Sequence, residues 1–180
     1  MADQVLLYIS AAADLQHERD ILGQAVTEIP TSLGWRVVLS PGSNDVVDLD
    51  AVLNAGVHLL LLGGDIRAPV GLEWTVARRA SRMPLPFYKT GILQTSAARS
   101  FIRDVAIETT WQPFSDGEDL RRKALRVLVD HILQRVVYYA LSLEETERLQ
   151  IWRADLDKSS APSETHGGTG ESSVILSRDH

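Results

Sequence analysis

Glu73 and Trp74 are the neighbouring side chains in this sequence that most directly suggest chemistry. They follow Gly71 and Leu72 where an apolar helical pattern begins, so Glu73 is expected in the first turn of that helix. A carboxylate there can hold ribose hydroxyls or stabilise the oxocarbenium-like charge that develops when an N-glycosidic bond breaks, and the indole can stack on a base. The alternatives are structural: Glu73 complements the positive end of the helix, worth about 0.3–1 kcal/mol, and Trp74 packs in the core.

Polar residues and glycines that follow two apolar segments could complete a ligand site around Glu73. Arg67 could pair with a phosphate, or it is an ordinary solvated charge. Asp14 is expected to cap the first helix and Asp65 to be a turn residue, with ligand contact secondary for both. The candidate site therefore has Glu73 as catalytic carboxylate, and its candidate ligand-binding residues are Ser10, Asp14, Gly63, Gly64, Asp65, Arg67 and Trp74.

The composition argues against several other classes of function. The 180 residues include no cysteine, which removes disulfides, thiolate catalysis and cysteine-based zinc sites. The five histidines lack metal-ligand spacing, and no glycine-rich phosphate loop or nucleophile elbow occurs. A formal net charge of −6 disfavours binding to a phosphate backbone. We therefore expect no metal site, no nucleic-acid partner and no certain cofactor.

Short apolar segments alternate with helical patterns along the first part of the chain. This alternation predicts an α/β fold, a doubly wound, flavodoxin-like parallel sheet of five strands in the order 2-1-3-4-5. In such a sheet, ligands bind outside the carboxyl ends of the strands where the order reverses, here between the first and third strands. The predicted strands are 5–9, 35–39, 58–62, 87–93 and 109–114, and the predicted helices lie near 15–33, 48–54, 72–83 and 101–105.

The rest of the chain is predicted to be helical and then unstructured. A long helix should begin after Asp116 and reach about Val136, with a second apolar stripe that packs in the core or meets another subunit. Ser142 and Glu145 have capping-box spacing, so a further helix is expected from there to about Asp155. The expected organisation is an α/β domain at 1–140, a helical extension at 141–156 and a disordered tail or linker at 157–180.

Targeting signals are not evident in the sequence. The apolar run at 5–9 is too short for a signal peptide or a membrane span. We therefore expect no membrane partner and a cytoplasmic location.

Three stretches of the chain resemble a TIR-like domain-of-unknown-function family. They are Val5–Ser10 followed by Asp14-x-x-x-Glu18-Arg19, Leu59–Gly64 followed by Gly71-Leu72-Glu73-Trp74 and Ala77, and Phe114–Leu120 before the long helix. The resemblance covers roughly residues 4–136. It implies a fold like that of TIR domains and nucleoside deoxyribosyltransferases. It also implies that Glu73 corresponds to the acidic residue that catalytic TIR domains use on NAD.

The resemblance implies two kinds of function. The leading hypothesis is a signalling or assembly module, of the kind found at the N-terminus of bacterial defence or signal-transduction proteins. Its partners would be further copies of itself or another signalling domain, with a nucleotide as a candidate ligand. The alternative is an enzyme that uses Glu73, either an NAD hydrolase, with NAD as substrate, or a nucleoside deoxyribosyltransferase. The sequence leaves this choice open.

Overall fold

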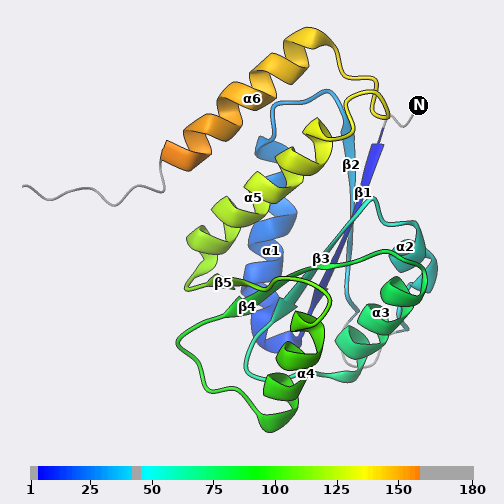
Figure 1. Cartoon of the computed structure of the whole chain (residues 1–180), viewed down its shortest axis with the longest axis vertical. Coiled ribbons are helices and arrows are strands. Elements are labelled where there is room, and N and C mark those ends of the chain that lie inside the picture. The colour runs from blue at the N-terminus through cyan, green and yellow to red at the C-terminus, as the bar shows by residue number, and fades with distance from the viewer. Residues whose placement is uncertain (1–3, 42–45, 159–180) are drawn as a thin grey trace, which may run out of the picture.

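A computed structural model describes residues 4–41 and 46–158, and its centre is one parallel sheet (Figure 1). The strands lie in the order β2-β1-β3-β4-β5, and neighbouring strands pair in parallel. This order confirms the predicted doubly wound α/β fold. The strands are β1 (Gln4–Ala11), β2 (Gly34–Leu39), β3 (Val57–Leu62), β4 (Leu85–Lys89) and β5 (Gln112–Phe114).

Two strands are shorter than predicted, for local reasons. β4 ends at Lys89 instead of residue 93, because the chain turns at Gly91 with a φ of 75°, a conformation that favours glycine. β5 begins at Gln112 instead of residue 109, because the amides of Glu108 and Thr109 bond to the Val105 carbonyl in the turn before it.

Helices cover both faces of the sheet (Figure 1). On one face, α1 and α5 pack against side chains such as Leu7, Ile9 and Leu61 and form the largest core cluster. On the other face, α2, α3 and α4 pack around Tyr8, Leu60 and Leu62. The helices are α1 (Gln16–Ala25), α2 (Leu49–Asn54), α3 (Ala68–Arg79), α4 (Ser96–Ala106), α5 (Gly117–Leu133) and α6 (Leu143–Lys158), with short 3-10 turns at Ala13–Leu15 and Val26–Glu28.

The start of α3 corrects the sequence-based expectation for Glu73. The helix begins at Ala68 rather than near residue 72, with Pro69 in its first turn. Proline suits this position because its fixed φ is helical and its missing N–H would be unpaired there anyway. Glu73 therefore lies in the second turn and not in the first. The side chain is too far along the helix for the expected interaction with the positive helix end, which falls off within the first turn.

The C-terminal helices pack together at one edge of the molecule (Figure 1). Asp116 caps α5 as predicted, accepting from the Asp119 amide at 2.9 Å, but the helix ends at Leu133 rather than near Val136. The predicted capping box is also present: Ser142 and Glu145 bond to each other's backbone amides, at 3.1 and 3.2 Å. The predicted disordered tail falls almost wholly on residues 159–180, outside the described residues; 157 and 158 belong to α6.

The second apolar stripe of α5 is covered by α6. Leu149 of α6 is fully buried in the main core, and Trp152 and Leu156 pack against that core. An ion pair between Arg153 and Asp130 joins the two helices. Of the two alternatives for this stripe, core packing holds for Val129, which is fully buried, whereas Val137 beyond the helix is exposed. In the part of the chain that the structure describes, no helix is both long and apolar enough to cross a bilayer.

Candidate functional site

The carboxyl group of Glu73 lies between α3 and the carboxyl-terminal halves of β1 and β2. Glu73 has 0% exposure, and its Oε1 accepts hydrogen bonds from the Tyr8 hydroxyl at 2.7 Å and the Ser40 hydroxyl at 2.5 Å. Tyr8 is on β1, and Ser40 directly follows β2. One carboxylate oxygen therefore fastens a helix to two neighbouring strands.

Burial changes the ionisation of this group. The pKa of Glu73 is raised by loss of solvation, although the neighbouring hydroxyl groups of Ser10, Ser40 and Tyr8 oppose the shift. The pKa of Tyr8 is also raised, first by burial and then by the neighbouring Glu73 charge. Among the described residues, Oε2 of Glu73 has no hydrogen-bond partner and no contact with solvent. Burial therefore shifts the ionisation equilibrium of this enclosed group towards the neutral form.

A second buried polar pair adjoins the first. The Ser10 hydroxyl lies 2.7 Å from Nε2 of His58, a residue of β3 that is only 4% exposed. Burial lowers the pKa of His58 to about 4, so the imidazole is neutral at pH 7. The Tyr8 and His58 rings meet edge to face, with centroids 5.1 Å apart. Tyr8, Ser10, Ser40, His58 and Glu73, which we call the buried polar cluster, thus lie on one face of the sheet.

The other predicted ligand-binding residues form a separate group at the end of β3. The sequence predicted that Asp14 caps α1, but Asp14 makes no such cap. Its Oδ2 instead accepts a hydrogen bond from the Gly64 amide at 2.8 Å. Asp65 accepts from its neighbour Ile66 and from the Thr95 hydroxyl, at 2.9 and 2.7 Å. Both carboxylates therefore hold turns together.

Arg67 and Trp74 lie apart from these groups. Arg67 is exposed at the position immediately before α3. Trp74 is 7% exposed and meets Phe101 of α4 edge to face, with ring centroids 6.0 Å apart. This placement favours the packing interpretation of Trp74 over base stacking.

The motif Asp14-x-x-x-Glu18-Arg19 fastens the carboxyl ends of three strands. Asp14 bonds to Gly64 after β3, and Glu18 forms an ion pair of 2.5 Å with Lys89 at the end of β4. Arg19 donates to the Ser40 carbonyl after β2, at 3.2 Å. These polar side chains, which drew attention as candidate ligands or family motif residues, are already engaged in contacts within the chain.

Three members of the buried polar cluster were not predicted as site residues from the sequence. Tyr8 and Ser40 were not considered, because each belongs to, or directly follows, a strand predicted as apolar, and His58 was considered only among the histidines that lack metal-ligand spacing. His58 carried a usable signal, because a polar residue within a fully buried strand needs a partner. Of the predicted site residues, the fold brings only Ser10 beside Glu73.

Gly63 is required by the close approach of Asp14. A Cβ at Gly63 would lie 2.2 Å from Oδ2 and 2.9 Å from Cγ of Asp14. We expect Gly63→Ala to displace Asp14, break its bond to Gly64 and lower the free energy of unfolding by about 1–3 kcal/mol, measured by urea denaturation. The control Gly71→Ala, whose Cβ would meet only Ile66 at 3.9 Å, should raise it by up to about 1 kcal/mol because alanine favours a helix. Equal effects of the two changes would contradict this explanation.

The fold and the site together define a doubly wound α/β protein with an enclosed acidic residue near the carboxyl ends of β1 and β2. Among residues 4–41 and 46–158, no three His, Asp or Glu side chains are grouped so that they could hold a metal ion. Comparison of the chain with family models, curated proteins and solved structures gave no match.

Proposed function

We propose that the chain is a TIR-like signalling module that acts by self-association, and that Glu73 has a structural role in it. The observation that carries this proposal is an exposed apolar surface on α2 and α3, here called the α2–α3 patch. It comprises Val46, Leu49, Leu53 and Leu72, which are 93%, 40%, 38% and 48% exposed. Apolar side chains gathered on a surface are typical of protein interaction sites.

Helix geometry supports the grouping of these residues. Leu49 and Leu53 are four residues apart in α2 and therefore share its outer side. Leu72 lies one turn before Val76 on the same side of α3, and Val76 packs against the core formed with α2. The two helices are in direct contact. Leu49, Leu53 and Leu72 are thus expected to form one surface, and Val46 lies three residues before α2.

Self-association is the use of the patch that we favour, because the patch lies beside the free edge of the sheet. β2 is the edge strand, and Leu39 at its end is 36% exposed. A surface that meets its own copy about a twofold axis needs only one such patch on each chain. The bonds from Glu73 to Tyr8 and Ser40 fix α3, and with it Leu72, against the strands.

Leu53→Asp should abolish or strongly weaken this association. We expect the dissociation constant of the self-association, measured by sedimentation equilibrium, to rise at least about tenfold, because a charge would be buried in an apolar contact. Ile107→Asp is the matched control, since Ile107 is an 84% exposed residue after α4, outside the patch, and the change in net charge is the same. A wild-type chain that stays monomeric at high concentration would contradict the proposal.

The enzymatic alternative predicts a different result with the same preparations. If wild-type protein releases nicotinamide from NAD and Glu73→Gln abolishes this release, the chain is an NAD hydrolase. Base exchange between nucleosides without NAD would instead indicate deoxyribosyl transfer. We favour the interaction module because the Glu73 carboxyl group is closed to solvent and already bonded.

A further inference from the structure

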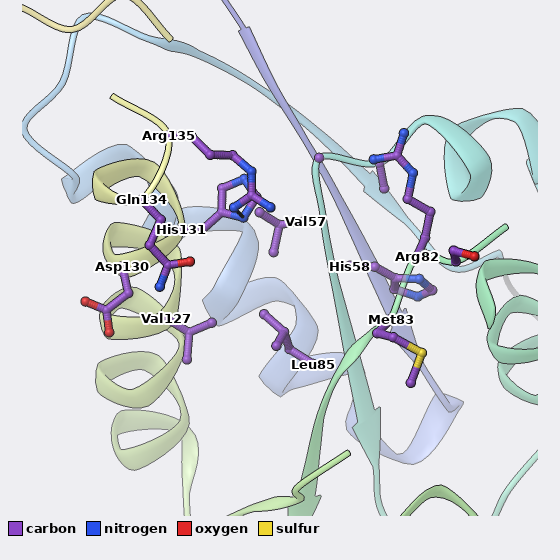
Figure 2. Close-up of a pocket in the computed structure, with 13 residues that line it drawn as sticks. Val57, His58, Arg82, Met83, Leu85, Val127, Asp130, His131, Gln134 and Arg135 are labelled. Carbon is purple, nitrogen blue, oxygen red and sulfur yellow. Dashed lines mark hydrogen bonds between the residues drawn. The ribbon is translucent and has the colours of Figure 1, made fainter. Parts of the chain in front are cut away.

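Two adjoining cavities lie at the amino ends of the strands, the edge opposite to the one where a doubly wound sheet is expected to bind ligands. Figure 2 shows the first of them. Their volumes are about 390 and 360 Å³. Gly56, Arg82, His131 and Arg135 line both, and the two neighbouring spaces are together called the amino-edge cavity. These residues come from the turns before β3 and β4 and from the end of α5.

The amino-edge cavity carries positive charge. Figure 2 shows Arg82 and Arg135 on either side of the start of β3. Within the part of the chain that the structure describes, neither arginine forms an ion pair with a carboxylate. Asp130 also lines the cavity, but its charge is matched by Arg153 of α6. Two uncompensated guanidinium groups on a chain of net charge −6 indicate a site for an anion.

The hydrogen bonds around His131 leave the Tyr139 hydroxyl as a neutral donor beside the two arginines. Nη1 of Arg135 lies 3.0 Å from Nδ1 of His131, and an arginine can only donate, so Nδ1 accepts. The imidazole proton is then on Nε2, which lies 3.0 Å from the Tyr139 hydroxyl and donates to it. The Tyr139 O–H is left to donate elsewhere. Burial and the Arg135 charge lower the pKa of His131 to about 4, so this pattern holds at pH 7.

The two parts of the cavity offer different surfaces. The part next to α5 includes Gln134 and His58, whose Nδ1 is buried without a partner among the described residues. The other part is lined by Tyr138 and Tyr139. Tyr138 is 61% exposed, so its ring can accept a flat group from solvent. The combination of cations, amide and aromatic rings suits a ligand with a charged end and an organic body.

We infer that the amino-edge cavity binds a small phosphate monoester, with its phosphate between Arg82 and Arg135 and its organic part against the tyrosines. Ligand sites typically measure about 300–1,000 Å³, so the space is larger than a phosphate ion needs. Arginine recognises phosphate through paired, charge-assisted hydrogen bonds. Neither Glu73 nor a residue of the α2–α3 patch lines this cavity, and His58 is the residue that it shares with the buried polar cluster.

Titration of the full chain with three probes tests the inference. AMP, ribose 5-phosphate and inorganic phosphate would be added separately, with binding followed by calorimetry and by amide chemical shifts. We expect the two monoesters to bind more tightly than inorganic phosphate and to shift the Gly56 amide. Arg82→Ala and Arg135→Ala should each weaken binding at least about tenfold. Arg148→Ala, which removes an exposed arginine of α6 that pairs with Glu144, should leave binding unchanged.

The possible outcomes separate the ligand classes. Tighter binding of AMP assigns the site to nucleotides, and equal binding of ribose 5-phosphate assigns it to sugar phosphates. Inorganic phosphate binding as tightly as both would overturn the monoester assignment. Binding that is lost in Arg67→Ala but kept in Arg135→Ala would place the ligand at the carboxyl edge and overturn the site itself, as would no binding of either monoester at about 1 mM.

Discussion

Glu73→Ala is expected to lower the free energy of unfolding by about 2–4 kcal/mol. The change removes the acceptor of two buried hydroxyl groups, those of Tyr8 and Ser40, and leaves a cavity beneath α3. A buried donor without a partner costs more than the hydrogen bond contributed, because the hydroxyl has also lost its water. Urea denaturation followed by circular dichroism would measure the effect.

Glu73→Gln distinguishes the contribution of the hydrogen bonds to stability from that of the ionisable carboxyl group. The amide oxygen can still accept from Tyr8 and Ser40, so we expect a smaller loss than in Glu73→Ala, about 1–2 kcal/mol at pH 7, because the amide N–H groups take the unpartnered place of Oε2. A Gln variant as unstable as the Ala variant would show that the hydrogen bonds are not the main contribution. If Glu73 were catalytic, the Gln variant would fold but would have no enzymatic activity.

Comparison of wild type with Glu73→Gln also predicts how the free energy of unfolding depends on pH. Below pH 4.5, the ordinary pKa of a glutamate side chain, the carboxyl group is protonated in both folded and unfolded chains. Above it the unfolded chain ionises Glu73, whereas burial raises the pKa in the folded chain, so the folded chain holds this proton up to a higher pH. The contribution of Glu73 to stability is therefore present at low pH and is lost as the pH rises towards the folded-state pKa. Glu73→Gln should gain stability relative to wild type over this range, and a gain towards low pH would contradict the raised pKa.

Leu149→Ala is expected to lower the free energy of unfolding by about 2–4 kcal/mol, although it lies near the end of the described chain. Leu149 is 0% exposed and belongs to the same core as β1, β3 and α5. Truncating it leaves a cavity between α6 and α5 that the rigid packing fills only in part. Thermal and urea unfolding would both report the loss.

Ile151→Ala is the matched control for Leu149. It lies in the same helix and is 66% exposed, so its truncation should change stability by less than about 0.5 kcal/mol. If both variants matched wild type, α6 would be a loosely attached extension. A large effect at Leu149 alone shows that α6 belongs to the folding unit.

The topology of the sheet could be predicted from local patterns. Five apolar segments alternating with helical periodicity restrict the chain to a parallel sheet with right-handed crossovers, and the order β2-β1-β3-β4-β5 is the economical solution. The caps at Asp116 and Ser142 were predictable for the same reason, because a cap depends on residues within a few positions of each other. The start of α3 could also have been predicted, since Pro69 marked it.

The environment of Glu73 was decided only by the tertiary structure. The sequence identified this residue and the strand-end residue Ser10, but which side of α3 faces the sheet depends on how the helix packs. That packing buried Glu73 against Tyr8 and Ser40, which are 65 and 33 residues away in the chain. Asp14 and Asp65 were drawn instead into turns that close the ends of the strands.

The sequence by itself thus determined the fold class, the helix caps and the candidate acidic residue, because these follow from spacing within one element. The tertiary structure decided the burial of Glu73, the covering of α5 by α6 and the amino-edge cavity. Arg82 and Arg135 meet at that cavity from distant parts of the chain, and no local pattern links them. The physical reason is that periodicity reports which side of an element is apolar, whereas a site depends on which elements converge and on what covers them.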